Sequence, residues 1–260
     1  MMQWFKIFFL PFALLGKKAR KGMHYLAVLS AFIYLPVRRT LFPPYSGAAS
    51  IFRTTIMQIY FTGVQALPLF VFLSLVFGCS MGLALNMANE LKAVLCTIIL
   101  KGVAPILGAF IILGRSGTAI TVELGNMTVM GEIRHLRRTG IDPLQHVVFP
   151  RLVGVTSATF GIGVFFGIGI VLVTGFFSSE PYFDFIKKIL NNWSAIDVII
   201  LAEKEILFGL IISMVACYQG LNLVPLTTEV PKATIRTVIH CIILCVVVDF
   251  MLTLISVGIL

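Results

Sequence analysis

Charged residues are scarce in this sequence, and their scarcity excludes an ordinary soluble protein. Only 12% of the 260 residues are charged and 58% are hydrophobic, with a mean hydropathy of +1.01. Soluble domains carry about 25% charged residues. The composition therefore predicts an integral membrane protein.

Several kinds of functional site are missing as well. The four histidines are scattered, and no spacing of His, Cys and Asp resembles a metal site. All five cysteines fall inside apolar runs, which indicates small buried side chains rather than a disulfide framework. The phosphate-binding loop G-x-x-x-x-G-K-[ST] is absent. We therefore expect no cofactor in this chain, and any ATP hydrolysis must come from a partner subunit.

Five apolar stretches are long enough to cross a bilayer, which takes about 20 residues. They cover about 62–88, 93–114, 147–177, 196–219 and 233–260. Residues 1–61 precede them, and "WFKIFFLPFALL" with its following lysines favours a helix in the membrane interface over a weak signal-anchor. The sequence thus predicts an all-α membrane protein with a cytoplasmic or interfacial region at 1–61 and five transmembrane helices within 62–260.

The basic residues predict the orientation of these helices. Most of the 20 lysines and arginines lie in 1–61, in 115–146 and around 220–232. Because cytoplasmic loops are enriched in basic residues, these segments are expected inside the cell. The N-terminus is then inside, while the loop 178–197 and the C-terminus are outside. The net charge of +9 is therefore explained by topology, and no nucleic-acid partner is expected.

The segment between the second and third apolar stretches is far more polar than its neighbours. It begins "GRSGTAITVELGNMTVMGEIRHLRRTGIDP" and reads as a helix from Gly117 to Leu136 that ends before Gly140 and Asp142-Pro143. A cytosolic helix held between two membrane helices could transmit force from a soluble motor. The alternative, an ordinary solvated loop helix, is equally compatible with the spacing.

Three stretches of the sequence resemble one family. "GRSGTAITVELGNMTVMGEIRHLRRTGIDPLQHVVFPRLVG" (114–154) is similar to the signature region of MlaE-type permeases, the membrane subunits of phospholipid ABC transporters associated with MCE proteins. "GLIISMVACYQGLN" (209–222) and "VPKATIRTVIHCIILCVVVDFMLTLI" (230–255) resemble further parts of the same family. The resemblance covers most of the chain from about residue 50.

The resemblance implies a homodimeric permease in the bacterial inner membrane. It would move phospholipids between that membrane and the outer envelope and maintain the lipid asymmetry of the outer membrane. The implied partners are a cytoplasmic ABC ATPase dimer, a periplasmic MCE-domain hexamer and a STAS-domain protein. A coupling helix within Thr118–Arg138 would dock on the ATPase, with contacts from Glu123, Met127, Glu132, Arg134, Arg137 and Arg138.

A lipid site is expected where two lysines lie at matching depth inside the membrane. Lys101 and Lys204 are each roughly 12–13 Å below the outer boundary at about 1.5 Å per residue, and either could bind a lipid phosphate. The candidate ionic partners are Glu203, Glu205 and Asp249. The candidate contacts for the acyl chains are Leu69, Phe72, Val76 and Leu254. An ion-pair network that only fixes helix packing is the alternative.

The sequence departs from the family beside one of these lysines. Many members carry an Arg-Glu pair before Gly-Pro in the second span, whereas this chain has "LKGVAP", with Lys101 followed by Gly102. The loss of that carboxylate is expected to leave Lys101 freer to bind phosphate. Two other classes of function remain possible from the residues alone: a membrane-embedded lipid-modifying enzyme and a structural envelope anchor.

Overall fold

The computed structural model describes residues 48–87, 99–178 and 181–259, and these residues form helices joined by short turns. Of the region 1–61 that was expected to be cytoplasmic or interfacial, residues 1–47 lie outside the described residues. Residues 48–61 belong to α2, which is part of a run long and apolar enough to cross a membrane. The first helical run consists of α2, the 3-10 turn η1 and α3. The second consists of the π-helical turn η2, α5, the π-helical turn η3 and α6. Their bounds are Ala48–Thr62, Val64–Ala66, Leu67–Met87, Ile99–Val103, Ala104–Ile112, Leu113–Gly117 and Thr118–Val129.

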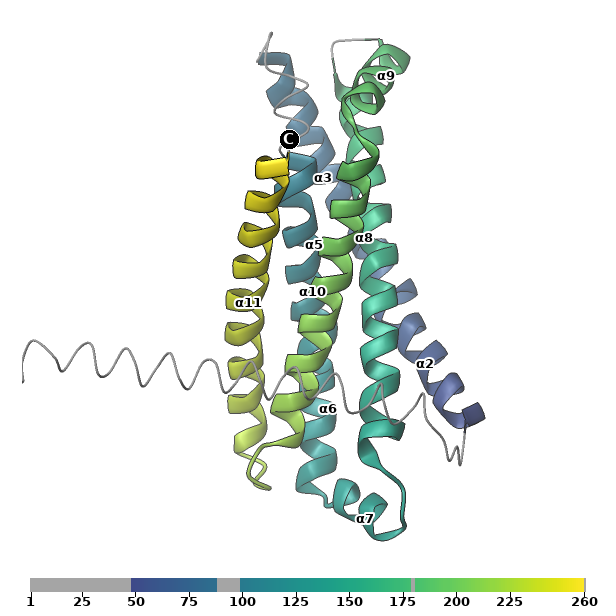
Figure 1. Ribbon diagram of the computed structural model, residues 1–260, viewed down its shortest axis with the longest axis vertical. Helices are drawn as coiled ribbons and strands as arrows, with labels where there is room; N and C mark the ends of the chain where they lie inside the picture. The colour runs from purple at the N-terminus through teal and green to yellow at the C-terminus, as the bar shows by residue number, and fades with distance from the viewer. Residues whose placement is uncertain (1–47, 88–98, 179–180, 260) are drawn as a thin grey trace, which may run out of the picture.

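The second half of the chain contains one short helix and four longer ones. The short helix α7 leads through the π-helical turn η4 into α8, and α9 precedes the two long helices α10 and α11. Their bounds are Glu132–Arg138, Leu144–Val148, Phe149–Phe177, Tyr182–Asn192, Ala195–Leu221 and Glu229–Ile259. Figure 1 shows the long helices side by side as an elongated bundle.

Four of the described helical runs are long and apolar enough to cross a membrane. They are Ser50–Leu85, Leu100–Val129, Leu144–Phe177 and Glu229–Ser256. The 27-residue α10, which corresponds to the fourth predicted span, is not among these four, but it packs against α8, α11 and α6 within the bundle. The all-α membrane architecture is therefore confirmed, while five crossings remain a prediction.

The prediction of one helix over 117–136 is wrong, because a glycine divides this segment into two helices. α6 ends at Val129, and Gly131 has a φ of 79°, a left-handed conformation that side chains disfavour. α6 continues the second membrane run and packs against α10 and α11. Only the seven-residue α7 projects from the bundle end, and Gly140, with a φ of 80°, follows it.

Two glycines of α3 set its distance from α8. A Cβ on Gly78 would lie 2.6 Å from the Val173 Cβ, and one on Gly82 would lie 2.7 Å from the Phe177 Cβ. Small residues at this spacing let membrane helices approach closely. Gly78 and Gly82 of α3 thus pack on α8 within the subunit.

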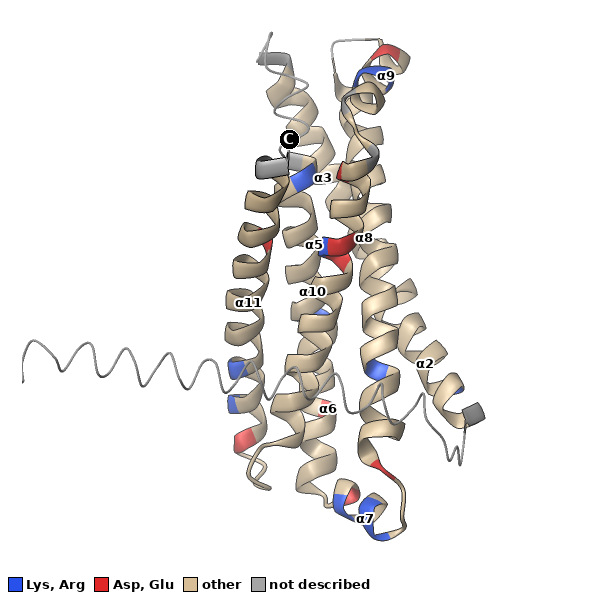
Figure 2. Cartoon of the chain, viewed as in Figure 1, with Lys and Arg blue, Asp and Glu red and all other residues tan. Residues whose placement is uncertain are grey.

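The two ends of the bundle are occupied by different short helices. α7 lies at one end, whereas α9 and the C-terminus of α11 lie toward the other (Figure 1). α7 contains Arg134, Arg137 and Arg138, and its ribbon is largely coloured as basic residues in Figure 2. The segments 115–146 and 178–197 were expected on opposite sides of the membrane, and α7 and α9 do lie at opposite ends of the bundle. Residues 118–129 of the expected cytoplasmic segment, however, belong to a membrane run.

Candidate functional site

A buried ion pair joins α10 to α11 inside the bundle. The Lys204 Nζ atom lies 2.8 Å from the Asp249 Oδ1 atom, and the side chains are 2% and 18% exposed. Lys204 also donates to the Thr253 Oγ1 atom at 2.9 Å and to the main-chain carbonyl of Lys101 at 3.2 Å. Asp249 is thus the partner of Lys204 among the three predicted candidates, and the contact with Lys101 agrees with the predicted matching depth.

A second ion pair lies beside the first. The Lys101 Nζ atom is 2.6 Å from the Asp197 Oδ2 atom, whose side chain is 4% exposed. Asp197 also accepts a hydrogen bond from the Ser194 backbone N–H at 2.9 Å, while the Ser194 hydroxyl accepts one from the Ile196 N–H at 3.2 Å. This capping box begins α10. It fixes the carboxylate that binds Lys101.

The expectation that the loss of the neighbouring carboxylate leaves Lys101 freer is therefore wrong. Gly102 stands where many relatives carry a carboxylate, but Asp197 of α10 supplies one from another helix. Asp197 was not among the predicted site residues, although the pattern Ser-x-x-Asp before an apolar run is a recognisable helix start. Lys101 also lies in a π-helical turn, η2, a backbone irregularity that is frequent at functional sites.

The two glutamates beside Lys204 pair with neither lysine. Glu203 is exposed on the bundle surface. Glu205 is 2% exposed, its Oε2 atom has no hydrogen-bond partner among the described residues, and its carboxyl group packs against Gly163 of α8.

The residues predicted to line an acyl-chain region lie on the outside of the subunit. The exposed fractions of Leu69, Phe72 and Val76 on α3 are 43%, 61% and 48%, and that of Leu254 on α11 is 53%. They line none of the cavities described below. Their assignment to a lipid contact stays a prediction, which would require them to face bilayer lipid or a second copy of the chain.

An ion pair near the other end ties α6 to α8. The Arg151 Nη2 atom lies 2.6 Å from the Glu123 Oε1 atom, and Arg151 also donates to the Val147 carbonyl at 2.8 Å. The Arg151 side chain is 8% exposed and the Glu123 side chain 57%. Glu123 was predicted to contact an ATPase. Its bond to Arg151 gives it a role within the chain.

The remaining predicted coupling residues gather around α7. Glu132, Arg134, Arg137 and Arg138 are exposed on it, while Ile133, 7% exposed, anchors it to the bundle. A shallow hollow of about 680 Å³ adjoins this helix. The hollow is lined by Met127, Met130, Gly131, Glu132, Arg134, His135, Leu136 and Arg138. A basic hollow with a mixed polar and apolar lining, at the end of a membrane bundle, is suited to a soluble protein partner.

The comparisons with known proteins agree on one family. The family model described as Permease MlaE matches residues 55–255. The chain belongs to the MlaE permease family. It is 27% identical over 220 residues to the intermembrane phospholipid transport system permease protein MlaE of Haemophilus influenzae, covering 80% of this chain and 84% of the relative.

Two further relatives carry a broader description. A probable ABC transporter permease protein of Rickettsia typhi is 25% identical over 256 residues, covering 92% of this chain and 95% of the relative. Another from Pyropia yezoensis is 26% identical over 212 residues, covering 75% and 79%. The chain is thus an MlaE-family ABC transporter permease. The matched range contains both buried ion pairs and α7.

Proposed function

We propose that this chain is the membrane subunit of a transporter that moves phospholipids between the bacterial inner membrane and the outer envelope, and so maintains outer-membrane lipid asymmetry. The Haemophilus influenzae relative is described as a phospholipid transport permease. The observation that carries the proposal is the double ion pair in an MlaE-family bundle. A charge at the bilayer centre costs about 2.5–3.5 kcal/mol on insertion scales, and such residues normally mark a transport pathway.

The chemistry of transport would use the exchange of ionic partners. Lys101, whose side chain is 27% exposed, is the more accessible of the two lysines. A phospholipid phosphate that approaches it can replace Asp197 as its counter-ion, since lysine binds phosphate as a point charge. Lys204 is enclosed and held by Asp249 and Thr253. In this proposal Lys204 positions the Lys101 backbone, and Lys101 contacts the headgroup.

The proposal includes five crossings with the N-terminus inside and the C-terminus outside. The charge-rich α10 would cross within a shell of apolar helices, which accommodates its ionisable side chains. A second copy of the chain would cover the exposed apolar faces of α3 and α11, where Leu69, Phe72 and Leu254 lie. The lipid path would then run near the axis of that homodimer.

Energy would come from a cytoplasmic ATPase dimer that docks at α7. The supporting features are the exposed basic face of α7 and the adjoining hollow of about 680 Å³. α7 follows α6 across a single glycine turn, and α6 is continuous with the run that contains Lys101. Movement of α7 could therefore reach the ion pairs through one helix. A periplasmic MCE hexamer and a STAS-domain protein complete the proposed assembly.

The coupling step is tested by charge reversal on α7. We expect Arg134→Glu, Arg137→Glu and Arg138→Glu, combined in one variant, to abolish co-purification of the ATPase, because the docking face changes sign. Lys187→Glu, an exposed reversal on α9 at the opposite end, is the matched control and should retain the ATPase. Normal ATPase recovery and lipid-stimulated ATP turnover with the triple variant would reject α7 as the docking element.

A further inference from the structure

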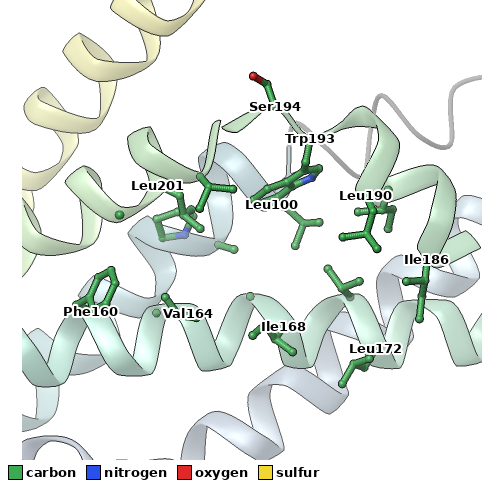
Figure 3. Close-up of a pocket in the computed structure, with 18 residues that line it drawn as sticks. Leu100, Phe160, Val164, Ile168, Leu172, Ile186, Leu190, Trp193, Ser194 and Leu201 are labelled. Atoms are coloured by element: carbon green, nitrogen blue, oxygen red, sulfur yellow. The ribbon is translucent and has the colours of Figure 1, made fainter. Parts of the chain in front are cut away.

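A cavity that adjoins the Lys101–Asp197 ion pair opens between α5, α8, α9 and α10. Its volume is about 520 Å³. Figure 3 shows Val164, Ile168 and Leu172 of α8 along one wall, with Trp193 and Leu201 opposite. Apart from Ser194, the side chains that line it are hydrocarbon, aromatic or absent, as in Gly163 and Gly167. The Ser194 hydroxyl is turned away from the cavity in this view.

The mouth of the cavity faces the outside of the bundle. Ile168 and Leu172 on α8, Leu190 on α9 and Val198 on α10 line it, yet they are 55%, 46%, 65% and 52% exposed. In a membrane that surface is covered by lipid. The opposite wall, with Leu100 and Ala104 almost fully buried, closes the cavity toward the core. A molecule can therefore enter from the bilayer.

Two polar groups of the described residues, Trp193 Nε1 and Lys101 Nζ, lie near the end of the cavity where α9 meets α10. The Trp193 Nε1 atom is buried and has no hydrogen-bond partner among the described residues. The Lys101 Nζ atom lies 6.0 Å from the centre of the Trp193 ring, within the range of a cation–π contact. A buried indole N–H normally finds an acceptor. An ester carbonyl of a lipid would provide one.

The size of the cavity favours a single hydrocarbon chain over a helix. A methylene group takes about the volume of a water molecule, roughly 30 Å³, so 520 Å³ accommodates an acyl chain of about 16–18 carbons. A helix about 10–12 Å across fills the same volume within roughly one turn. From Phe160 to Leu172 the cavity extends about 18 Å along α8 at 1.5 Å per residue, which suits an extended chain.

We propose that this cavity is a binding site for one acyl chain of a membrane phospholipid, with the ester group at Trp193. The site lies on the α8–α10 side of the subunit, away from the α3 and α11 faces assigned above to the dimer. This proposal rests on the proposed function only in placing the protein in a bilayer. Its occupant would be a lipid held beside Lys101 rather than one exposed to water.

The test uses the fluorescence of Trp193. The full chain with Trp4→Phe, purified in detergent, is titrated with phosphatidylglycerol that carries bromine on its acyl chains, because bromine quenches tryptophan on contact. We expect saturable quenching that unlabelled phosphatidylglycerol reverses. Quenching that grows in proportion to the lipid without saturation, or no quenching, would overturn the proposal whatever the variants below show.

Two glycines of α8 provide a matched pair of variants. A Cβ added to Gly167, which lines the cavity, or to Gly161, which does not, would meet nothing within 4 Å. We expect Gly167→Phe to fill the cavity and weaken the saturable binding at least tenfold, and Gly161→Phe to leave it unchanged. Ala202→Phe fills the cavity from α10 and should act as Gly167→Phe does. Equal binding in all three variants would contradict the site.

The results distinguish failure of this lipid site from failure of the proposed function. Saturable lipid binding that is lost with Gly167→Phe, in a chain that supports no ATP-driven transport, would keep this site and reject the transporter. ATP-driven transport by a chain without saturable quenching would do the reverse. If quenching disappears only when partner subunits are added, a protein segment occupies the cavity, and the acyl-chain assignment is wrong.

Discussion

Removal of one member of the Lys204–Asp249 pair should destabilise the chain more than removal of both. The Lys204 side chain is 2% exposed and lies 2.8 Å from Asp249. Loss of one partner from a buried pair costs about 3–5 kcal/mol, because it leaves an uncompensated charge. Thr253 and the Lys101 carbonyl still bind Lys204 in Asp249→Asn, so we expect the lower end, about 3 kcal/mol.

The double variant separates stability from transport. Lys204→Met with Asp249→Leu removes both charges, and replacement of a buried pair by apolar residues is often nearly neutral. We expect it to lose less than about 1.5 kcal/mol relative to the wild type, a non-additivity typical of residues in contact. It should nevertheless fail to transport phospholipid, since Lys101 loses the support of Lys204.

The assay is reversible unfolding of the purified chain in mixed micelles, with phospholipid transport measured on the same preparations. Lys232→Met serves as a control because this lysine is 61% exposed, and surface pairs contribute little. Additive losses in the double variant would show that the pair is not coupled. A stable double variant with normal transport would show that the ion pair serves only helix packing and is not needed for transport.

Two further predictions concern topology and helix packing. Single cysteines placed at His135 and Phe183 should label from opposite sides of the membrane, position 135 from the cytoplasm; labelling of position 135 from outside would reject the orientation. Gly209→Ala should destabilise the chain by about 1–3 kcal/mol, because a Cβ there would lie 2.7 Å from the Thr156 Cα atom, whereas Gly102→Ala meets nothing within 4 Å and should unfold as the wild type does. Equal denaturation midpoints would contradict the packing of α8 on α10.

The helical membrane architecture could be predicted because long apolar runs and scarce charges follow directly from the cost of burying polar groups in lipid. The boundaries of the helices were harder to predict. α6 was read as part of a cytosolic helix because its sequence is moderately polar, yet Ile120, Thr121 and Leu124 are buried against neighbouring helices. α6 ends just before Gly131, which has a positive φ. A glycine in the sequence does not show whether its φ is positive.

The site was predicted in its residue types but not in all its pairings. Depth along a helix follows from counting residues, so Lys101 and Lys204 could be placed at one level. Which carboxylate faces which lysine depends on the rotation of α10 and α11, which the sequence does not specify. Asp197 was therefore missed, and Glu203 and Glu205 were included although neither pairs with a lysine.

ATP-driven phospholipid transport by the reconstituted permease–ATPase complex tests the central claim most directly. The complex is placed in vesicles that contain isotope-labelled phospholipid, and the transfer of label to acceptor vesicles is followed with and without ATP. We predict transfer that requires ATP and disappears in the Lys101→Ala variant while the complex stays assembled. Transfer that is independent of ATP, or equal in wild type and Lys101→Ala, would contradict the account.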